Sequence, residues 1–335
     1  MSDTRHARKI AILDVLKHSD TPFSSARIAE ILKSQGNTIS ERTVRLYLNE
    51  LDNEGLTKNL GKRGRLITDE GIAEFENSRT YERVGSLAAK IDQMSYSMSF
   101  DLATRMGTVV INSSIVRSDH LVRLADHICR GFESGYAMGR LLSLHGPGSV
   151  IGTIRIPEGH IGLSTVCSIT LNGVLVRHGI PVHSRFGGLL EIRNGAPTRF
   201  VEMIEYSGTT IDPLEAFIRS AMTDYVGAIT SGNGRIGASF REIPSASREH
   251  VVSLAESLKK IGLGGFMEIG YGGRPVLDTP VSEGRAGAVV IGGLNPMAIF
   301  EEHGIRINLR ALSGVIEYTD LFHYDELKER IAALV

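Results

Sequence analysis

The 335-residue sequence has no tryptophan, and only 6% of its residues are aromatic. Proteins that bind single-stranded nucleic acid by base stacking need exposed rings, so this composition disfavours that class. Cys129 and Cys167 are the only cysteines, too few for a disulfide framework or a four-sulfur metal site. No stretch approaches the roughly 18 uninterrupted apolar residues of a membrane span. The opening residues, MSDTRHARKI, also lack an apolar signal core. These absences predict a cytoplasmic protein without membrane contact.

A strong charge of either sign is also missing. Lysine and arginine number 37, aspartate and glutamate 38, and the formal net charge is -1 at neutral pH. Any affinity for nucleic acid must therefore come from a local basic face. The length and the 42% apolar content are sufficient for about two or three domains with a sizeable core. We expect a multidomain globular protein.

The first 76 residues begin with three predicted helices. They are expected over residues 4–18, 24–34 and 40–54. The apolar stripes of the first two are Ile12, Leu13, Leu16, Ile28, Ile31 and Leu32. In the third helix, Val44, Leu48 and Leu51 have the spacing of a buried face. The opposite face, which carries Arg42, Arg45 and Asn49, is then exposed.

A basic β-hairpin is expected directly after these helices. Two β-prone runs, 56–60 and 65–68, flank a turn rich in glycine. Its cations are Lys58, Lys62, Arg63 and Arg65. Three helices and a basic hairpin form the winged-helix arrangement, in which the third helix enters the major groove of DNA and the wing holds phosphates. Residues 1–76 are therefore predicted to be a winged helix-turn-helix domain.

The third helix and the wing are the predicted contacts to double-stranded DNA. Arg42 and Arg45 can bind guanine edges or phosphates, and Asn49 can bind adenine. The remaining candidates are Ser40, as helix N-cap, Thr43, and the four cations of the hairpin. The acidic cluster Glu50, Asp52 and Glu54 should face away from the duplex. Winged helices also serve as protein-interaction modules, which is the alternative.

Residues 77–100 are expected to form a connecting helix. Its apolar residues recur at alternating spacings of three and four: Val84, Leu87, Ile91, Met94 and Met98. Such a seam can pair two helices, but it lasts only about two heptads, so packing onto the protomer's own body is an equal alternative. A homodimer or higher homo-oligomer is expected because winged-helix repressors commonly bind two half-sites.

Residues 101–335 contain a weak internal repeat. The stretch LVRLADHI (121–128) matches VVSLAESL (251–258), and 175–192 matches 300–318 around the shared His-Gly-Ile. Both copies have the order strand, helix, Gly-rich strand, helix, strand. We therefore expect two α/β units, over about 105–195 and 235–320. The predicted fold class of the whole chain is α+β multidomain, with a winged helix followed by an effector-binding α/β domain over 101–335.

The segment between the two copies contains a sharp helix start. Asp212 is an expected N-cap, Pro213 fits the first helical position, and Glu215 fits the returning acid of a capping box. A helix over about 213–225 follows. The small polar residues before it, 207–210, could hold a carboxylate at free amides, but a solvated turn already neutralised by Asp212 is the favoured alternative.

The stretch GLSTVCSITLNGVLVRHGIPVHSRFGGLLEI holds the densest set of polar candidates. Thr165, Ser168, Thr170 and Asn172 alternate with apolar residues or end a strand, which would gather them on one face. Cys167 could act as a nucleophile with His178 as its base, but no acidic residue stands at a recognisable spacing to complete such a catalytic site. Metal binding by His160, His178 and His183 is a further alternative. No Walker loop, dinucleotide fingerprint or HExxH motif is present, and neither catalytic residues, a metal nor a cofactor is predicted.

Several of these stretches resemble the NrpR family of nitrogen-responsive transcriptional repressors. The resemblance rests on ISERTVRLYLNELDNEGL, the linker RVGSLAAKIDQMSYSMSFDL, STVCSITLNGVLVRHGIPVHSRFGGLLEI, RFVEMIEYSGTTIDPLEAFI and GASFREIPSASRE. It covers nearly the whole chain, with one regulatory domain after the winged helix. It implies a non-enzymatic repressor of nitrogen-assimilation genes that binds a palindromic operator and is released by 2-oxoglutarate.

A site for 2-oxoglutarate, which is small and doubly anionic, needs cations or oriented amides together with hydroxyl donors. The candidates are Arg155, Thr165, Ser168, Thr170, Asn172, Arg185, Gly187, Gly188, Ser207, Thr209 and Arg241. Three alternatives stay open: a repressor that senses another metabolite, an enzyme with an autoregulatory DNA-binding domain, and a C-terminal part that only mediates oligomerisation.

Overall fold

The computed structural model describes residues 2–17, 19, 21–34, 39–78, 86–151 and 154–334. The chain divides into two compact units, 1–84 and 85–335. Among the described residues, no helix has both the length and the apolar character needed to cross a bilayer.

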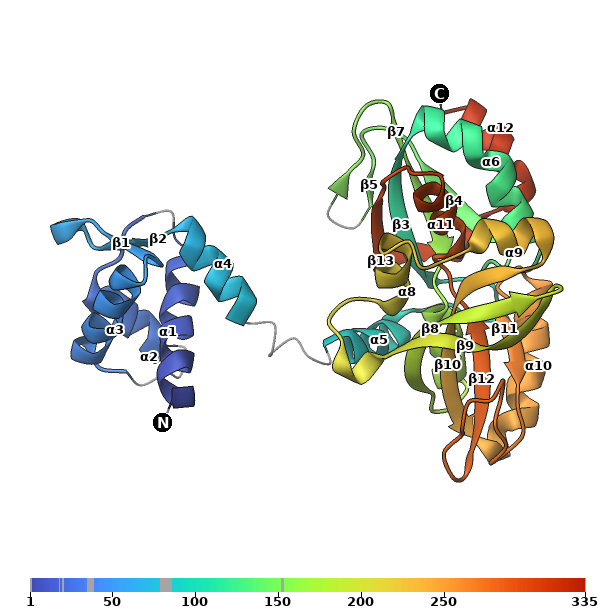
Figure 1. Ribbon diagram of the computed structural model, residues 1–335, viewed down its shortest axis with the longest axis horizontal. Helices are drawn as coiled ribbons and strands as arrows, with labels where there is room; N and C mark the ends of the chain where they lie inside the picture. The colour runs from blue at the N-terminus through green and yellow to red at the C-terminus, as the bar shows by residue number, and fades with distance from the viewer. Residues whose placement is uncertain are drawn as a thin grey trace. The chain divides into compact units, whose positions relative to one another are not determined.

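The first unit is a winged helix, as predicted (Figure 1). Its helices are α1 (Ser2–Lys17), α2 (Ser25–Ser34) and α3 (Glu41–Asn53). The wing is an antiparallel pair, β1 (Thr57–Asn59) and β2 (Arg65–Ile67), joined through the 3-10 turn η1 (Gly61–Arg63). A further helix, α4 (Asp69–Ser78), follows the wing.

The apolar stripes of the three predicted helices meet in one core. Ile12, Leu13, Leu16, Ile28, Leu32, Val44, Leu48 and Leu51 are all buried, and Ile31 packs partly buried at the edge. Helix α4 was not expected from the sequence. The Thr68 hydroxyl caps it by accepting from the Gly71 amide at 3.0 Å, and Phe75 adds its ring to the core. The threonine before an acidic first turn was the available signal.

The second unit contains two mixed α/β halves, each built around a five-stranded sheet. One sheet has the order β13-β3-β7-β4-β14, and the other β11-β12-β10-β8-β9. The first sheet consists of β3 (Thr108–Arg117), β4 (Leu141–His145), β7 (His160–Val166), β13 (Asn308–Glu317) and β14 (Phe322–His323). The second consists of β8 (His183–Arg193), β9 (Ala196–Glu205), β10 (Gly234–Pro244), β11 (Phe266–Ile269) and β12 (Arg285–Ile291). A small hairpin, β5 (Val150–Ile151) with β6 (Ile154–Arg155), stands apart.

Seven helices and four short 3-10 turns complete the described part of this unit after β3. The helices are α6 (Ser118–Glu133), α7 (Ile169–Arg177), α8 (Pro213–Arg219), α9 (Tyr225–Ser231), α10 (Arg248–Lys260), α11 (Asn295–Glu302) and α12 (Leu327–Ala332). Turn η2 (Tyr206–Gly208) leads toward α8, η3 (Ser245–Ser247) precedes α10, and η4 (Tyr318–Asp320) precedes β14. A further turn, η5 (Tyr324–Glu326), leads into α12.

The element order repeats inside this unit. The series β3-α6-β4-β7-α7-β8 is followed by β10-α10-β11-β12-α11-β13. Equivalent polar side chains anchor the two copies: the Thr170 hydroxyl bonds the Val110 amide at 3.1 Å, and the Asn295 side chain bonds the Gly237 amide at 2.8 Å. The last strand of each copy joins the sheet of the other, because β8 pairs with β10 and β13 pairs with β3. The two copies therefore complete each other's sheets.

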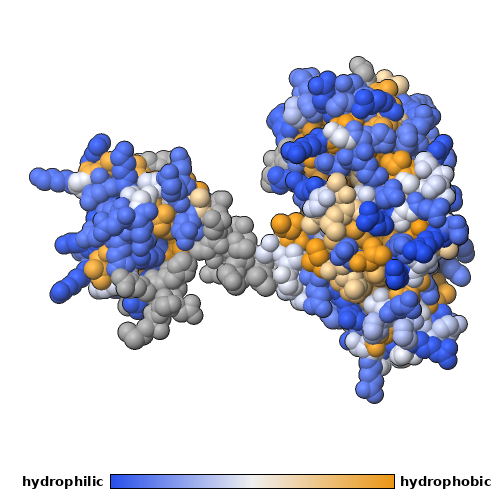
Figure 2. Space-filling view, in the orientation of Figure 1, coloured by the Kyte–Doolittle hydropathy of each residue, from blue (hydrophilic) through white to orange (hydrophobic). Residues whose placement is uncertain are grey.

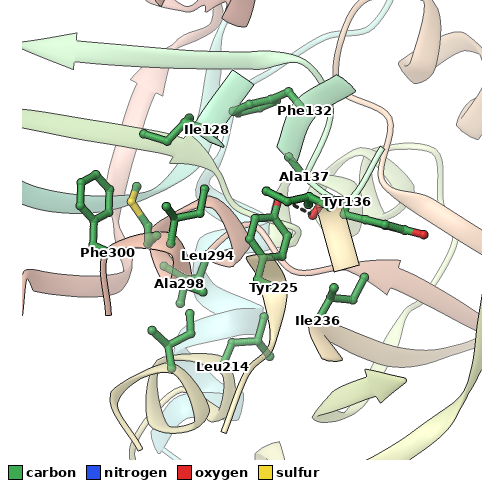
Figure 3. Close-up of a cluster of buried hydrophobic side chains, with 14 of the residues drawn as sticks. Ile128, Phe132, Tyr136, Ala137, Leu214, Tyr225, Ile236, Leu294, Ala298 and Phe300 are labelled. Atoms are coloured by element: carbon green, nitrogen blue, oxygen red, sulfur yellow. Dashed lines mark hydrogen bonds between the residues drawn. The ribbon is translucent and has the colours of Figure 1, made fainter. Parts of the chain in front are cut away.

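One apolar core continues across both copies (Figure 3). Tyr225 at the start of α9 is fully buried among residues of α6, α8 and α11, and its hydroxyl donates to the Tyr136 carbonyl at 3.3 Å. Gly131 of α6 is required here, since an added Cβ would lie 2.4 Å from the Tyr225 hydroxyl oxygen. The core thus holds α6 and α9 at a fixed distance.

Helix α5 (Ser86–Ser97) packs on the body of the second unit. Leu87, Ile91 and Met98 of the predicted seam are buried in its second core cluster, and Met94 lies partly buried beside them. Met98 approaches α7 so closely that a Cβ on Gly173 would lie 2.0 Å from the Met98 sulfur. The seam therefore serves packing within the protomer. Val84, the first residue of that seam, lies outside the described residues.

Two expectations for local structure are wrong. The helix expected over 213–225 ends at Arg219, because the chain turns at Ala221 with a φ of 53°. A separate helix, α9, capped by Asp224, begins at Tyr225. The polar stretch is no continuous strand either: β7 ends at Val166 and α7 begins at Ile169, so Thr170 and Asn172 are helical. Asp212 does cap α8, whereas Glu215 pairs with Arg219 and does not return to the cap.

Candidate nucleic-acid interface and effector cavity

The exposed face of α3 carries the predicted guanidinium groups. Arg42 and Arg45 are exposed, while Val44 and Leu48 of the opposite face are buried. Ser40 caps the helix, as expected, by accepting from the Thr43 amide at 3.2 Å. Hydrophilic residues predominate on the visible face of this unit (Figure 2). This surface can meet a polyanion without unfolding any part of the core.

The ion pair of Arg45 does not prevent such a contact. Its Nη2 lies 2.6 Å from the Glu41 Oε1, and both side chains are largely exposed. A pair of this kind stabilises a helix by well under about 1 kcal/mol. A phosphate or a guanine edge can therefore displace Glu41 at little cost.

Arg65 and Asn49 differ from the sequence expectation. The Arg65 Nε lies 2.8 Å from the Asp52 Oδ2, and its Nη2 donates to the Asn49 Oδ1 at 2.8 Å. Arg65 is mostly buried in this pairing, so it fixes the wing strand to α3 and is not a free phosphate ligand. The amide oxygen of Asn49 is occupied by the same contact, which removes one half of a bidentate contact to adenine.

The remaining wing cations are exposed. Lys58, Lys62 and Arg63 flank or form the η1 turn, and they have no ion pair within the described part of the chain. The acidic residues behind α3 are engaged elsewhere: Glu50 and Glu54 pair with Lys9 of α1 at 3.1 and 2.6 Å. The carboxylates are thus neutralised against the protein body, as expected for a helix that presents only its basic face.

In the second unit, six of the predicted effector residues do not share a cavity. They are Arg155, Thr165, Thr170, Gly187, Gly188 and Thr209. Arg155 lies in the β5–β6 hairpin and donates to the Gly148 carbonyl at 3.1 Å. Thr209 forms a local turn with Ile211, with a bond of 2.9 Å to its carbonyl. Neither residue lines a cavity together with the other candidates.

The other four of these six have structural roles. The Thr165 hydroxyl donates to the Gly293 carbonyl at 2.6 Å, which links the two copies, and Thr170 is bound to Val110. Gly187 and Gly188 allow close packing, since an added Cβ would lie 2.8 Å from Pro213 and 2.5 Å from the Glu202 carbonyl oxygen. Their polar or small character reflects buried backbone contacts, which a sequence pattern cannot distinguish from ligand contacts.

Five predicted effector residues do come together. They are Ser168, Asn172, Arg185, Ser207 and Arg241. Arg241 of β10 pairs in register with Ser184 of β8, whose hydroxyl accepts from the Asn172 amide at 2.9 Å. Ser184, Arg185 and Ser207 line one cavity of about 320 Å³, and Ala88, Ile91 and Asp92 of α5 form its roof. The cavity lies where the last strand of the first copy joins the sheet of the second.

Arg241 is the central feature of this cluster. Its side chain is 1% exposed, and its guanidinium donates to the Ser168 carbonyl at 2.9 Å and to the Ser168 hydroxyl at 2.8 Å. The Nε has no partner, and no carboxylate pairs with Arg241 within the described residues. Burial lowers its pKa to about 10, so the group remains charged at neutral pH. A buried charge without a counterion is costly and is normally paired.

Arg185 differs from Arg241 in having a carboxylate. Its Nη1 lies 3.0 Å from the Glu242 Oε1 and donates to the Pro280 carbonyl at 2.8 Å. Glu242 is buried and also accepts from the Ser282 amide at 2.9 Å. Arg185 therefore forms a wall of the cavity with its charge already compensated.

Sequence reasoning missed Tyr206, which connects the cluster. Its ring lines both the 320 Å³ cavity and a small adjoining cavity of about 20 Å³, which also contacts Ser168 and Cys167. Burial raises the pKa of Tyr206 and raises that of Cys167 to about 12, so both stay protonated at neutral pH. Cys167 and His178 lie at opposite ends of α7, which is inconsistent with a nucleophile and base pair. No signal in the sequence singles out Tyr206.

Asp212 should make stability pH-dependent. Burial raises its pKa to about 6, although it accepts from the amides of Leu214 and Glu215 at 2.9 and 3.2 Å. Between pH ~4 and ~6 the folded chain then binds more protons than the unfolded chain, so stability falls as pH rises through this range. An asparagine at position 212 would still cap α8 but would carry no charge.

Relative to Asp212→Asn, the wild type should therefore lose about 1 kcal/mol of unfolding free energy between pH 5 and pH 7. Urea unfolding followed by circular dichroism at both pH values measures this. A difference between the two proteins that is the same at pH 5 and pH 7 would show that Asp212 does not titrate in this range.

A winged helix joined to a larger α/β unit is the architecture of a transcription regulator. Residues 84–323 match the family model for NrpR regulatory domains NRD1 and 2, and residues 10–75 match the ribonuclease R winged-helix domain. The chain is 34% identical to the global nitrogen regulator NrpRI of Methanosarcina mazei, over 95% of this chain and 98% of that protein. The chain therefore belongs to the NrpR family of global nitrogen regulators.

Other relatives differ from this chain in length. The global nitrogen regulator NrpR of Methanococcus maripaludis is 32% identical over 93% of this chain, which spans 54% of that longer protein. A crystal structure of a nitrogen repressor-like protein from Methanococcus jannaschii matches with a TM-score of 0.59 at 24% identity, over 72% of this chain and 98% of that chain. This last likeness supports the fold of the second unit.

Proposed function

We propose that the protein is a cytoplasmic transcriptional repressor of nitrogen-assimilation genes, released from a palindromic operator by 2-oxoglutarate. The observation that carries the ligand part is the buried Arg241 without a carboxylate partner within the described residues, which pairs in register with Ser184 in the wall of the cavity under α5. The relatives' names, global nitrogen regulators, support the process that it controls.

The DNA contacts follow from the first unit. In a winged-helix complex, α3 lies in the major groove, where Arg42 and Arg45 donate to guanine edges or phosphates. Lys58, Lys62 and Arg63 of the wing meet the adjacent backbone. A homodimer would place two such units on the half-sites of a palindrome, since operator symmetry follows protein symmetry.

The ligand chemistry follows from the cluster under α5. A carboxylate of 2-oxoglutarate would supply the counterion that Arg241 lacks, and a charge-assisted bond of this kind is stronger than a neutral one. The hydroxyls of Ser168 and Tyr206 and the amide of Asn172 are donors for its remaining oxygens. The side-chain oxygen of Asn172 also has no partner in the described structure.

Helix α5 offers a route for release. It forms the roof of the cavity through Ala88, Ile91 and Asp92 and follows, after residues 79–85, the last helix of the DNA-binding unit. A ligand that prefers a displaced α5 would favour a state with low operator affinity. A hundredfold preference corresponds to about 2.7 kcal/mol of coupling.

A mobility-shift titration on the protein's own upstream region tests this function. Retardation should weaken with salt, because phosphate contacts release counterions, and it should be lost on addition of 2-oxoglutarate. Glutarate, which lacks the keto oxygen, is the matched control. Retardation that is the same with 2-oxoglutarate and without any addition would contradict the proposed effector.

A further inference from the structure

A second cavity lies in the other half of the regulatory unit. It has a volume of about 520 Å³ and is lined by residues 308–313 of β13, by Glu215 and Arg219 of α8, by Ser113 of β3 and by Lys90 of α5. None of the effector candidates discussed above lines it. Only Leu312 is shared with the small cavity near Ser168.

The internal duplication relates this cavity to the first one. The alignment of the two His-Gly-Ile segments places Arg310 at the position of Arg185. Residues 182–185 line the first cavity, and the equivalent start of β13 lines the second. Both strands are also irregular at this position. The pairing of β8 with β10 shifts its register opposite Phe240 and Arg241, and the pairing of β13 with β3 shifts its register between Arg310 and Gly314. The same structural position thus occurs twice.

The charges of the second cavity favour an anion. Its lining contains three cations, Lys90, Arg219 and Arg310, and one carboxylate, Glu215. Glu215 is already committed, because it lies 2.8 Å from Arg219 and accepts from the Ala311 amide at 3.1 Å. Lys90 and Arg310 have no ion pair in the part of the chain that the structure describes. Arg185, by contrast, is neutralised by Glu242.

The β13 bulge supplies hydrogen-bonding groups beside these cations. The Ser313 hydroxyl donates to the Ile111 carbonyl at 3.1 Å and lies 2.7 Å from the Ser113 hydroxyl, so polar groups line this wall. Leu312 within the bulge has a φ of 45°, which is strained for a leucine. Bulges and strained backbone are concentrated at ligand sites.

We propose that this second cavity binds a small organic or inorganic anion through a carboxylate or phosphate group held by Lys90 and Arg310. The proposal rests on the duplication and the local charge, so it does not depend on which effector releases DNA. Because α5 contributes Lys90 to this cavity and Ile91 to the first, ligands at the two sites would contact the same helix.

Isothermal titration of the full chain with 2-oxoglutarate, and separately with inorganic phosphate, tests the proposal. For at least one of these anions, we expect a site that Arg310→Gln and Lys90→Gln each weaken by about tenfold or more, the loss of one charge-assisted bond. Arg306→Gln, an exposed arginine outside the cavity, should leave affinity unchanged. Both residues that form the site are exposed, so circular dichroism of the variants should match the wild type.

The results separate this site from the proposed effector site. A titration in which Arg241→Met abolishes all binding, while Arg310→Gln changes nothing, overturns the second site and leaves the proposed function intact. The absence of heat with either anion at millimolar concentration overturns it as well. A third result is also informative: an anion binds through Arg310, but 2-oxoglutarate does not release the operator complex. This result would support the second site and contradict 2-oxoglutarate as the effector.

Discussion

Replacement of Arg241 by methionine should produce a folded repressor that no longer responds to its effector. Methionine has a similar length and removes a buried charge that has no carboxylate partner. Exchanging buried charged groups for apolar ones is often neutral or stabilising. The ligand, however, loses its buried counterion, a loss that typically exceeds about 2 kcal/mol, or roughly 30-fold in affinity.

The measurement is the 2-oxoglutarate concentration that releases half of the operator complex. Arg235→Met is the matched control, because Arg235 lies on the same strand β10 and is exposed. A variant that keeps wild-type stability and also the wild-type release concentration would remove Arg241 from the effector site. The second cavity, around Arg310, would then be the candidate for the effector site.

Loss of both arginines of α3 should abolish specific operator binding. With Arg42→Ala and Arg45→Ala together, we expect affinity to fall by at least about 100-fold, since each good contact to a base contributes ~1–3 kcal/mol. Stability should change little, because both side chains are exposed and the Glu41 pair is weak. Val44 and Leu48 still bury the other face of the helix.

Binding measured on operator and on unrelated DNA at several salt concentrations distinguishes base contacts from phosphate contacts. Arg8→Ala, an exposed residue of α1, controls for the loss of a positive charge. Equal weakening on both DNAs, with a smaller salt slope, would assign these arginines to phosphates alone. Unchanged affinity on the operator would contradict the role of α3.

The fold of the first unit was largely predictable because its signals are local. Each helix carries its own apolar stripe, and Ser40 caps α3 as its position suggested. The duplicated order of the second unit was also visible in two pairs of similar segments. The exchange of β8 and β13 between the sheets was not, because strand pairing over long sequence distances leaves no mark in either strand alone.

The candidate site was predictable only in part. The chemistry of an arginine predicts Arg241 as a ligand residue, and the structure places it in a polar cluster with Ser168. Thr165 and Thr170 have equally suitable hydroxyls, yet buried carbonyl groups occupy both. Arg65 of the wing was expected to be free and is paired with Asp52, 13 residues before it. Which polar group is free depends on contacts between distant segments, and these are decided only by the complete fold.

The exchange of strands determines how the chain can acquire its structure during synthesis. The Ser313 hydroxyl and the Ile111 carbonyl that it binds are 202 residues apart. While the nascent chain emerges from the ribosome, β3 keeps an unpaired edge until β13 has been made, and β8 can pair only with β9 before β10 appears. The first copy alone is thus an aggregation-prone intermediate with two open edges. Deletion of residues from β13 onward should destroy both halves together, since neither is an independent folding unit.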